Sequence, residues 1–227
     1  MFCSTGTCIS VKIFRIMKKY WAEFLGTFMM VFAGTGAIII NDLYGSVSHL
    51  GIGLTFGLVV MAVIYSIGSI SGAHINPAVS IAFWVAKRFE TKEVLPYIGF
   101  QLLGAFLASL SLKVMFPEHE FLGATIPVDS WQQSFVLEFT LTFILMFVIL
   151  LLSQGSKEVG VMTGLVIGSV VALEAIFAGP VSGASMNPAR SIAPAVVSGH
   201  LTHLWLYVVA TTLGAIASVY AVELIKD

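Results

Sequence analysis

Long apolar segments separated by short clusters of charged residues dominate this chain. The segments that are free or nearly free of Asp, Glu, Lys and Arg lie at residues 24–41, 43–86, 94–112, roughly 131–153, roughly 159–179 and 191–222. A helix that crosses a bilayer needs about 20 mostly apolar residues, so each segment predicts one span. Segments 43–86 and 191–222 are too long for one span, and each predicts a span plus a re-entrant piece. We therefore expect six membrane spans and two additional apolar segments.

The composition agrees with a small multi-span membrane domain and excludes other classes. Of the 227 residues, 58% are hydrophobic and 10% are charged, and the mean hydropathy is +0.97. A soluble domain carries roughly a quarter charged residues, so an ordinary cytosolic globule is excluded. The 11 basic and 12 acidic residues nearly cancel, which argues against a nucleic-acid partner. Cys3 and Cys8 provide no metal or disulfide framework, and we expect no metal and no cofactor.

The positions of the basic residues predict the orientation. Cytoplasmic loops carry an excess of Lys and Arg, and nine basic residues share one side if the N-terminus is cytoplasmic. They are Lys12, Arg15, Lys18, Lys19, Lys87, Arg88, Lys92, Lys157 and Lys226. We therefore expect an integral, multi-pass protein of the plasma or inner membrane with both termini in the cytoplasm. Residues 1–16 do not resemble a signal peptide and are either a mis-assigned start or a disordered tail, which leaves a single domain at 17–227.

The two halves of the chain resemble each other. The matching pairs are residues 71–80 with 182–191 (offset 111), Glu23 with Glu138 (offset 115) and Gly104 with Gly214 (offset 110). We place repeat 1 at about 17–115, a linker at about 116–131 and repeat 2 at about 132–227. Because each repeat holds three spans, the second must enter the membrane from the opposite face. The functional site of such an inverted repeat is expected near the membrane midplane.

An Asn-Pro-Ala motif occurs once in each additional apolar segment. The six residues are Asn76, Pro77, Ala78, Asn187, Pro188 and Ala189. Asn is a preferred N-cap and Pro suits the first helical position, so each motif predicts the start of a helix that runs to about Ala86 or Val197. Such a helix is roughly 16 Å long, about half of a ~30 Å bilayer core. Two half-helices should therefore enter from opposite faces and meet near the centre.

This arrangement has consequences for transport. The positive ends of both half-helices would face one point and repel cations. Each Asn would use its oxygen as a cap and keep its NH₂ free as a donor, so a water held there could not relay a proton. The loop backbone before each motif must line a polar cavity, because its carbonyls would otherwise be unsatisfied in lipid. These carbonyls belong to Gly72, Ala73, His74, Gly183, Ala184 and Ser185.

Four charged residues fall within the apolar segments or directly at their edges. Arg190 lies three residues after Asn187 and therefore on the same face of its half-helix. A charged residue at the bilayer centre costs about 3 kcal/mol on insertion scales, and we interpret Arg190 as a solute-binding group and cation barrier. Glu23 and Glu138 are expected to accept loop N–H groups and so support the re-entrant loops. Glu174 has no counterpart in repeat 1, and we expect it to clamp a loop rather than line the pore.

On these residues the chain resembles the aquaporin, or major intrinsic protein, family over residues 17–227. The sequence Ala-Gly-Pro-Val-Ser-Gly-Ala-Ser-Met-Asn-Pro-Ala-Arg-Ser at 178–191 is most similar to the nodulin-26-like branch. The resemblance implies an all-α membrane protein with six transmembrane helices and two re-entrant half-helices. It also implies a homotetramer with one pore per subunit, embedded in lipid, that passes water and small neutral solutes.

The resemblance also implies a selectivity filter near the outer mouth, formed here by Phe56, Ala175, Ala184 and Arg190. Strict water channels of the family carry His at the position of Ala175, whereas classical glycerol facilitators carry Asp at that of Ser191. This chain departs from both patterns, so the substrate prediction is mixed. We expect a passive channel for water and small uncharged solutes such as glycerol that excludes ions and protons, and urea and neutral metalloid hydroxides also fit. A strictly water-selective channel and a coupled secondary transporter are the alternatives. No nucleophile–base pair occurs in the pore segments, so an enzyme is not expected.

Overall fold

The computed structural model describes residues 5–226, with side chains described over 17–156 and 160–226. These residues form eight α-helices and no strand. The helices are α1 Thr5–Tyr44, α2 Ser48–Ser71, α3 Pro77–Val85, α4 Thr91–Met115, α5 Trp131–Leu152, α6 Lys157–Ser182, α7 Pro188–Ser198 and α8 Leu204–Ile225. Six are long and apolar enough to cross a membrane, whereas α3 and α7 have 9 and 11 residues. The predicted six spans and two half-helices are confirmed, with α3 ending one residue before the expected Ala86.

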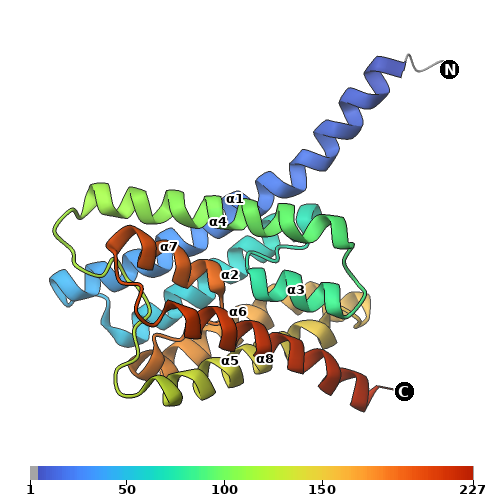
Figure 1. The fold of residues 1–227 in the computed structure, drawn as a ribbon. Helices are drawn as coiled ribbons and strands as arrows, with labels where there is room; N and C mark the ends of the chain where they lie inside the picture. Colours follow the sequence, from blue (N-terminus) through green and yellow to red (C-terminus); the bar gives the residue numbers. More distant parts are fainter. Residues whose placement is uncertain (1–4, 227) are drawn as a thin grey trace.

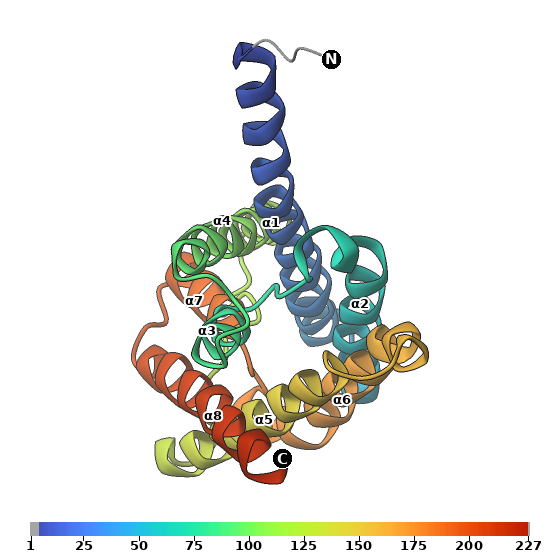
Figure 2. The ribbon, with the colours of Figure 1, turned by 90° about the vertical axis from the view of Figure 1, so that its right-hand side faces the viewer.

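The six long helices form a ring, and the two short helices fill its gap between α4 and α8 (Figure 2). In the first half α1 packs against α2 and α4, and in the second half α5 packs in the same way against α6 and α8. Each half-helix packs against a helix of the other half, α3 against α8 and α7 against α4. The start of α1 and the end of α8 lie at the same end of the bundle (Figure 1). The exchange of α3 and α7 between the halves is the arrangement that an inverted repeat produces.

Matched glycines bring the helices of each half into close contact. A Cβ on Gly104 of α4 would lie 2.2 Å from the carbonyl oxygen of Phe24 in α1, and a Cβ on Gly214 of α8 would lie 2.2 Å from that of Phe139 in α5. Only glycine permits this approach, as in other membrane helix pairs with small residues at the interface. The repeat therefore extends from sequence to packing.

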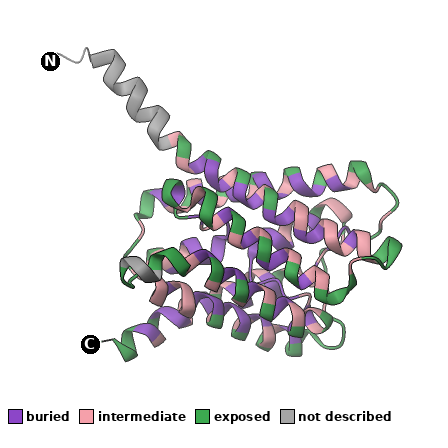
Figure 3. Ribbon diagram, turned by 180° about the vertical axis from the view of Figure 1, so that it is seen from behind, coloured by how far each residue is buried: buried purple, intermediate pink, exposed green. Residues whose placement is uncertain are grey.

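Buried and exposed residues alternate around every long helix, so that exposed residues face away from the bundle (Figure 3). Many of the exposed side chains are large and apolar, among them Leu58, Leu103, Leu107, Leu173 and Tyr220. A soluble protein rarely presents so continuous an apolar surface. The buried side chains include carboxylates, hydroxyls and a guanidinium. Polar groups inside and apolar groups outside are what a bilayer requires.

The N-terminal helix begins inside the segment assigned to a tail. Residues 1–4 of that segment lie outside the described part of the chain, whereas residues 5–16 continue α1. This part of α1 projects beyond the bundle (Figure 1).

Candidate functional site

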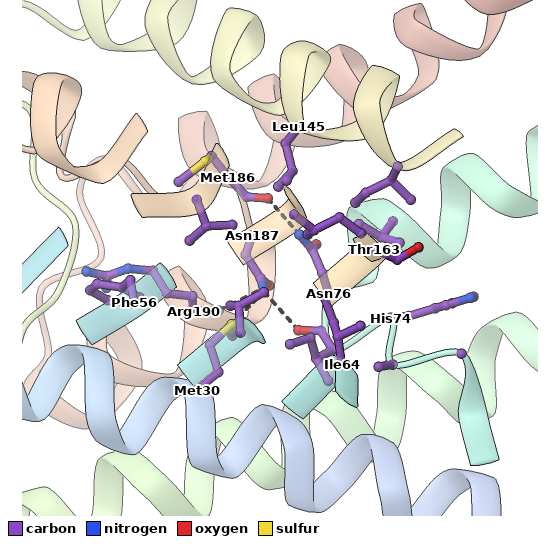
Figure 4. A pocket seen from close by; sticks show the side chains of 18 of the residues that line it. Met30, Phe56, Ile64, His74, Asn76, Leu145, Thr163, Met186, Asn187 and Arg190 are labelled. Carbon is purple, nitrogen blue, oxygen red and sulfur yellow. Dashed lines mark hydrogen bonds between the residues drawn. The ribbon is translucent and has the colours of Figure 1, made fainter. Parts of the chain in front are cut away.

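A cavity of about 130 Å³ runs along the centre of the bundle. Phe56 and Arg190 lie at one end, Asn187 and Asn76 in the middle, and His74 at the other end (Figure 4). The remaining loop residues of the lining are Gly72, Ala73, Ile75, Ala184, Ser185 and Met186. Helical side chains that complete the lining include Met30, Val60, Ile64, Val79, Phe83, Leu145, Ile149, Ile167 and Val171. The loops therefore contribute polar groups to the cavity, whereas the helices, apart from Arg190, contribute mainly apolar side chains, with Ser153 and Thr163 as polar exceptions.

Both half-helices begin with the same side-chain cap. The Oδ1 atom of Asn76 accepts the N–H of Ala78 at 2.9 Å, and Oδ1 of Asn187 accepts the N–H of Ala189 at 3.0 Å and that of Arg190 at 3.4 Å. A proline follows each asparagine as the first helical residue, where its missing N–H costs nothing. The N-termini of α3 and α7 consequently meet at the middle of the cavity.

The amide nitrogens of the two asparagines are not free donors, which corrects the sequence-based expectation. Nδ2 of Asn76 donates to the Met186 carbonyl at 2.7 Å, and Nδ2 of Asn187 donates to the Ile75 carbonyl at 2.9 Å (Figure 4). Nδ2 of Asn187 also lies 3.7 Å from Sδ of Met30. Buried loop carbonyls need donors, and those of Ile75 and Met186 find theirs in the asparagine of the opposite repeat. Each NH₂ has two hydrogens. One of each is bound across the loops, and the second hydrogen of Asn187 is directed at Sδ of Met30, which lines the cavity.

Glu23 holds the first re-entrant loop, and each of its two carboxylate oxygens accepts two hydrogen bonds. Its Oε1 accepts from the hydroxyl of Ser71 at 2.7 Å and the N–H of His74 at 2.9 Å. Its Oε2 accepts from the N–H of Ile75 at 2.6 Å and from Nε2 of Gln101 at 2.8 Å. A buried carboxylate that accepts several donors in this way is fixed in place and fixes its donors.

Glu138 plays the same part for the second loop. Its Oε1 accepts from the hydroxyl of Ser182 at 2.7 Å and the N–H of Ser185 at 2.8 Å, and its Oε2 accepts from the N–H of Met186 at 2.9 Å. Glu138, like Glu23, has no exposed surface. Neither carboxylate is among the residues that line the cavity.

Two tyrosines that the sequence reasoning missed fasten the start of each loop. The hydroxyl of Tyr97 donates to the Ser71 carbonyl at 2.8 Å, and that of Tyr207 donates to the Ser182 carbonyl at 2.7 Å. The tyrosines are 110 residues apart, as are Gly104 and Gly214. That shared offset was the signal that could have identified them.

Arg190 is buried beside Phe56. Its Nη1 donates to the Gly123 carbonyl at 2.7 Å, and its guanidinium carbon lies 5.1 Å from the centre of the Phe56 ring, within cation–π range. Its Nε has no hydrogen-bond partner among the described residues. The contact with Gly123, in the connection between α4 and α5, was not anticipated from the sequence.

The other expected filter residues lie near this pair. Ala184 lines the cavity. Ala175 does not line it but belongs to the same buried apolar cluster as Phe56 and Ala184. Gly183 also lies outside the lining, with Thr125 3.0 Å from the position that its Cβ would take.

Glu174 does not clamp a loop, and that expectation is wrong. It is 1% exposed, and neither carboxylate oxygen has a hydrogen-bond partner among the described residues. It is also absent from the cavity lining. The sequence revealed a carboxylate in a span, but not whether a loop N–H would reach it.

Comparisons with known proteins agree with this geometry. The family model described as Major intrinsic protein matches residues 10–221. A probable NIP-type aquaporin of Nicotiana alata is 44% identical over 227 residues, which cover 99% of this chain and 83% of the relative. Aquaporin NIP1-1 of Zea mays is 43% identical over 227 residues, covering 99% and 80%. Among solved structures, the aquaglyceroporin from Plasmodium falciparum has a TM-score of 0.84 at 27% identity, covering 92% of this chain and 96% of that one.

Proposed function

The chain belongs to the major intrinsic protein family, close to its nodulin-26-like branch, and from this premise we propose that it is a passive channel for water and glycerol that excludes ions and protons. The observation that carries the proposal is the central cavity, in which Asn76 and Asn187 meet below Phe56 and Arg190. Polar loop groups together with mainly apolar helical side chains suit a solute with hydroxyl groups on one edge and CH groups on the other.

Exclusion of ions is supported by the charges around the cavity. The N-termini of α3 and α7 each carry about half a positive charge, and both meet at Asn76 and Asn187. Arg190 adds a full positive charge at one end of the lining. A cation in the cavity would meet all three, whereas a neutral molecule would not be repelled.

Exclusion of protons is supported by the amide groups of the two asparagines. The second hydrogen of Asn187 meets only Sδ of Met30, a weak acceptor in the cavity lining that a water oxygen can replace. A water whose oxygen accepts from Nδ2 of Asn76 and Nδ2 of Asn187 has no acceptor site left for a neighbouring water. It therefore points both its hydrogens outward, and a proton wire is interrupted at this position.

Passage of glycerol is supported by the residues around Arg190. The Phe56 ring offers an apolar face, the guanidinium offers donors, and Ala184 contributes only a methyl group. Ala175, in the same cluster, is also small. We therefore favour a water and glycerol channel over a strictly water-selective one. Urea and neutral metalloid hydroxides are similar in size to glycerol and are further candidate solutes.

A coupled secondary transporter is less well supported. Such a protein would need a carboxylate free to bind and release an ion near the midplane. Glu23 and Glu138 already accept hydrogen bonds from the two loops on every oxygen and lie outside the cavity lining. Releasing either one would free the loop that it holds.

The protein is an integral multi-pass membrane protein, and we propose that both termini face the cytoplasm. The basic residues near the ends of the spans support this orientation, which places Arg190 toward the outside and His74 toward the cytoplasm. Membership of the family supports a homotetramer, in which each subunit would keep its own cavity.

The function is tested with purified protein in liposomes. Stopped-flow light scattering would follow water efflux and glycerol re-entry, and a pH-sensitive dye would follow proton flux. Val171→Trp fills the lining, whereas the neighbouring Leu173→Trp, 61% exposed on the outer face of α6, is the matched control. We expect wild type and Leu173→Trp to pass both solutes and Val171→Trp to pass neither. Solute flux no higher than in empty liposomes, or proton flux comparable to solute flux, would overturn the proposal.

A further inference from the structure

Arg190 is held by a part of the chain that lies outside α7 and the loop before it. The connection between α4 and α5 reaches over the end of the cavity and contributes the Gly123 carbonyl, 2.7 Å from Nη1 of Arg190. The same connection places the hydroxyl of Thr125 2.8 Å from that of Ser191. The position of this short stretch of backbone therefore decides where the guanidinium lies.

The turn that presents Gly123 has an unfavourable backbone. Leu122 has a φ of +51°, which is uncommon for a residue with a side chain, and Gly123 has a φ of +70°. A Cβ on Gly123 would lie 2.8 Å from Cβ of Thr35, so the turn is pressed against α1. Backbone in such a conformation persists only when surrounding contacts fix it.

The turn is closed by its own backbone bond, from the Ala124 N–H to the Phe121 carbonyl at 2.9 Å, and Leu122 makes two further contacts that tie it to the rest of the protein. The Leu122 side chain is fully buried in a small cluster with Ile39 and Leu112. The Leu122 N–H donates to Nδ1 of His119 at 3.0 Å. The side chain thus anchors one edge of the turn and the imidazole anchors its amide.

His119 is itself held in one orientation. Its Nε2 lies 3.3 Å from Oδ2 of Asp42, at the end of α1, and its side chain is 7% exposed. Because Nδ1 accepts from Leu122, the ring hydrogen is on Nε2 and points to the Asp42 carboxylate. A chain of contacts then runs from Asp42 through His119, Leu122 and Gly123 to the guanidinium.

We propose that His119 is a positioning residue for Arg190. By accepting the Leu122 N–H it fixes the turn whose Gly123 carbonyl holds the guanidinium at the edge of the cavity. This inference rests on the proposed role of Arg190 in solute passage. His119 does not touch the solute and is absent from the cavity lining.

Loss of this contact has a defined consequence for transport. Nη1 of Arg190 would lose its acceptor, while Nε already has none among the described residues. A buried guanidinium seeks other oxygens, and those near it are loop carbonyls and solute in the cavity that it lines. It would turn inward and narrow the passage, which hinders glycerol more than water.

Two substitutions of His119 test the roles of its two ring nitrogens separately. His119→Asn places an amide oxygen near the position of Nδ1 and can still accept the Leu122 N–H. His119→Gln places its amide near the position of Nε2, reaches Asp42 and leaves Leu122 without its acceptor. We expect His119→Asn to keep the wild-type ratio of glycerol to water permeability. We expect His119→Gln to lower that ratio about two- to tenfold, the range that one hydrogen bond spans.

Asp42→Asn is the matched control, because its amide oxygen can still accept from Nε2 of His119. We expect this variant to keep the wild-type ratio of glycerol to water permeability. Hydrogen–deuterium exchange of the peptide that contains Leu122 is a readout independent of transport. It should become faster in His119→Gln and stay unchanged in His119→Asn, at equal melting temperatures in detergent.

Equal ratios for the Asn and Gln variants would overturn the inference. So would faster exchange at Leu122 in His119→Gln with an unchanged ratio. If the wild type passed neither solute, the proposed function would fall, and exchange at Leu122 would still decide whether His119 holds the turn.

Discussion

Asn76 and Asn187 each donate a side-chain N–H to the residue that precedes the other. Asn76 binds the carbonyl of Met186 at 2.7 Å, and Asn187 binds that of Ile75 at 2.9 Å. Each asparagine therefore caps its own half-helix and also closes the loop of the opposite repeat. The two half-helices are joined by this pair of bonds, although they lie in different halves of the chain.

The reciprocal pair predicts that Asn76→Asp destabilises the fold. Aspartate keeps the cap acceptor for Ala78 but faces the Met186 carbonyl with an oxygen instead of a donor. A buried carbonyl left without its donor costs about 1–3 kcal/mol, and we expect a clear fall in the unfolding free energy. Thermal unfolding in detergent measures it. Asn41→Asp is the control, because the partly exposed Asn41 also accepts a backbone N–H, that of Ser48, through its Oδ1. Equal melting temperatures for both variants would contradict the reciprocal pairing.

Arg190→Val should widen the passage and weaken ion exclusion. It removes the Gly123 contact and the stack on Phe56 but leaves the N-termini of α3 and α7. We expect glycerol flux to rise by about two- to tenfold, the effect of one hydrogen bond, together with some leak of protons or cations.

The liposome assay with a pH-sensitive dye measures both effects of Arg190→Val. Arg190→Lys is the control, since it keeps the charge without the planar fork, and should leak less. An unchanged solute profile with no leak would show that Arg190 does not control the cavity.

The features that the sequence predicted depend on local pattern. The spans follow from apolar length, and the starts of α3 and α7 follow from the Asn-Pro pair, because caps and proline act within a few residues. The expected partners of Glu23 and Glu138 followed from the repeat, which places a loop with free N–H groups beside each one.

The features that the sequence did not predict depend on tertiary contacts. Nothing in the order of residues 116–130 indicates that the Gly123 carbonyl reaches Arg190, because the connection crosses the bundle before it does so. The sequence also did not indicate that the amide of Asn187 reaches the Ile75 carbonyl. Nor did it indicate that Glu174 has no hydrogen-bond partner among the described residues, because helices distant in sequence surround it.

Glu174→Leu should not destabilise the protein. The corresponding position of repeat 1, 111 residues earlier, is the fully buried Val63. Replacing a buried polar group without a partner by an apolar one of similar size is neutral or stabilising, by about 1–3 kcal/mol at most. We expect a melting temperature equal to or above that of wild type and unchanged water flux. Glu174→Gln, still polar, should bring no gain, and a lower melting temperature for Glu174→Leu would show that Glu174 has a stabilising partner.

Ala175→His should cut glycerol flux far more than water flux. Ala175 is buried in the same cluster as Phe56 and Ala184, and an imidazole there would extend past the methyl group toward the cavity near Arg190. A steric barrier falls hardest on the larger solute, so paired osmotic-shrinkage and glycerol-reswelling traces at matched protein density should separate the two. Ala175→Leu, similar in volume but without a ring nitrogen, tests whether size alone is responsible, and we expect it to behave alike. If wild type excluded glycerol outright, or if Ala175→His slowed both solutes equally, the cavity would be narrowed elsewhere and the strictly water-selective alternative would replace the present one.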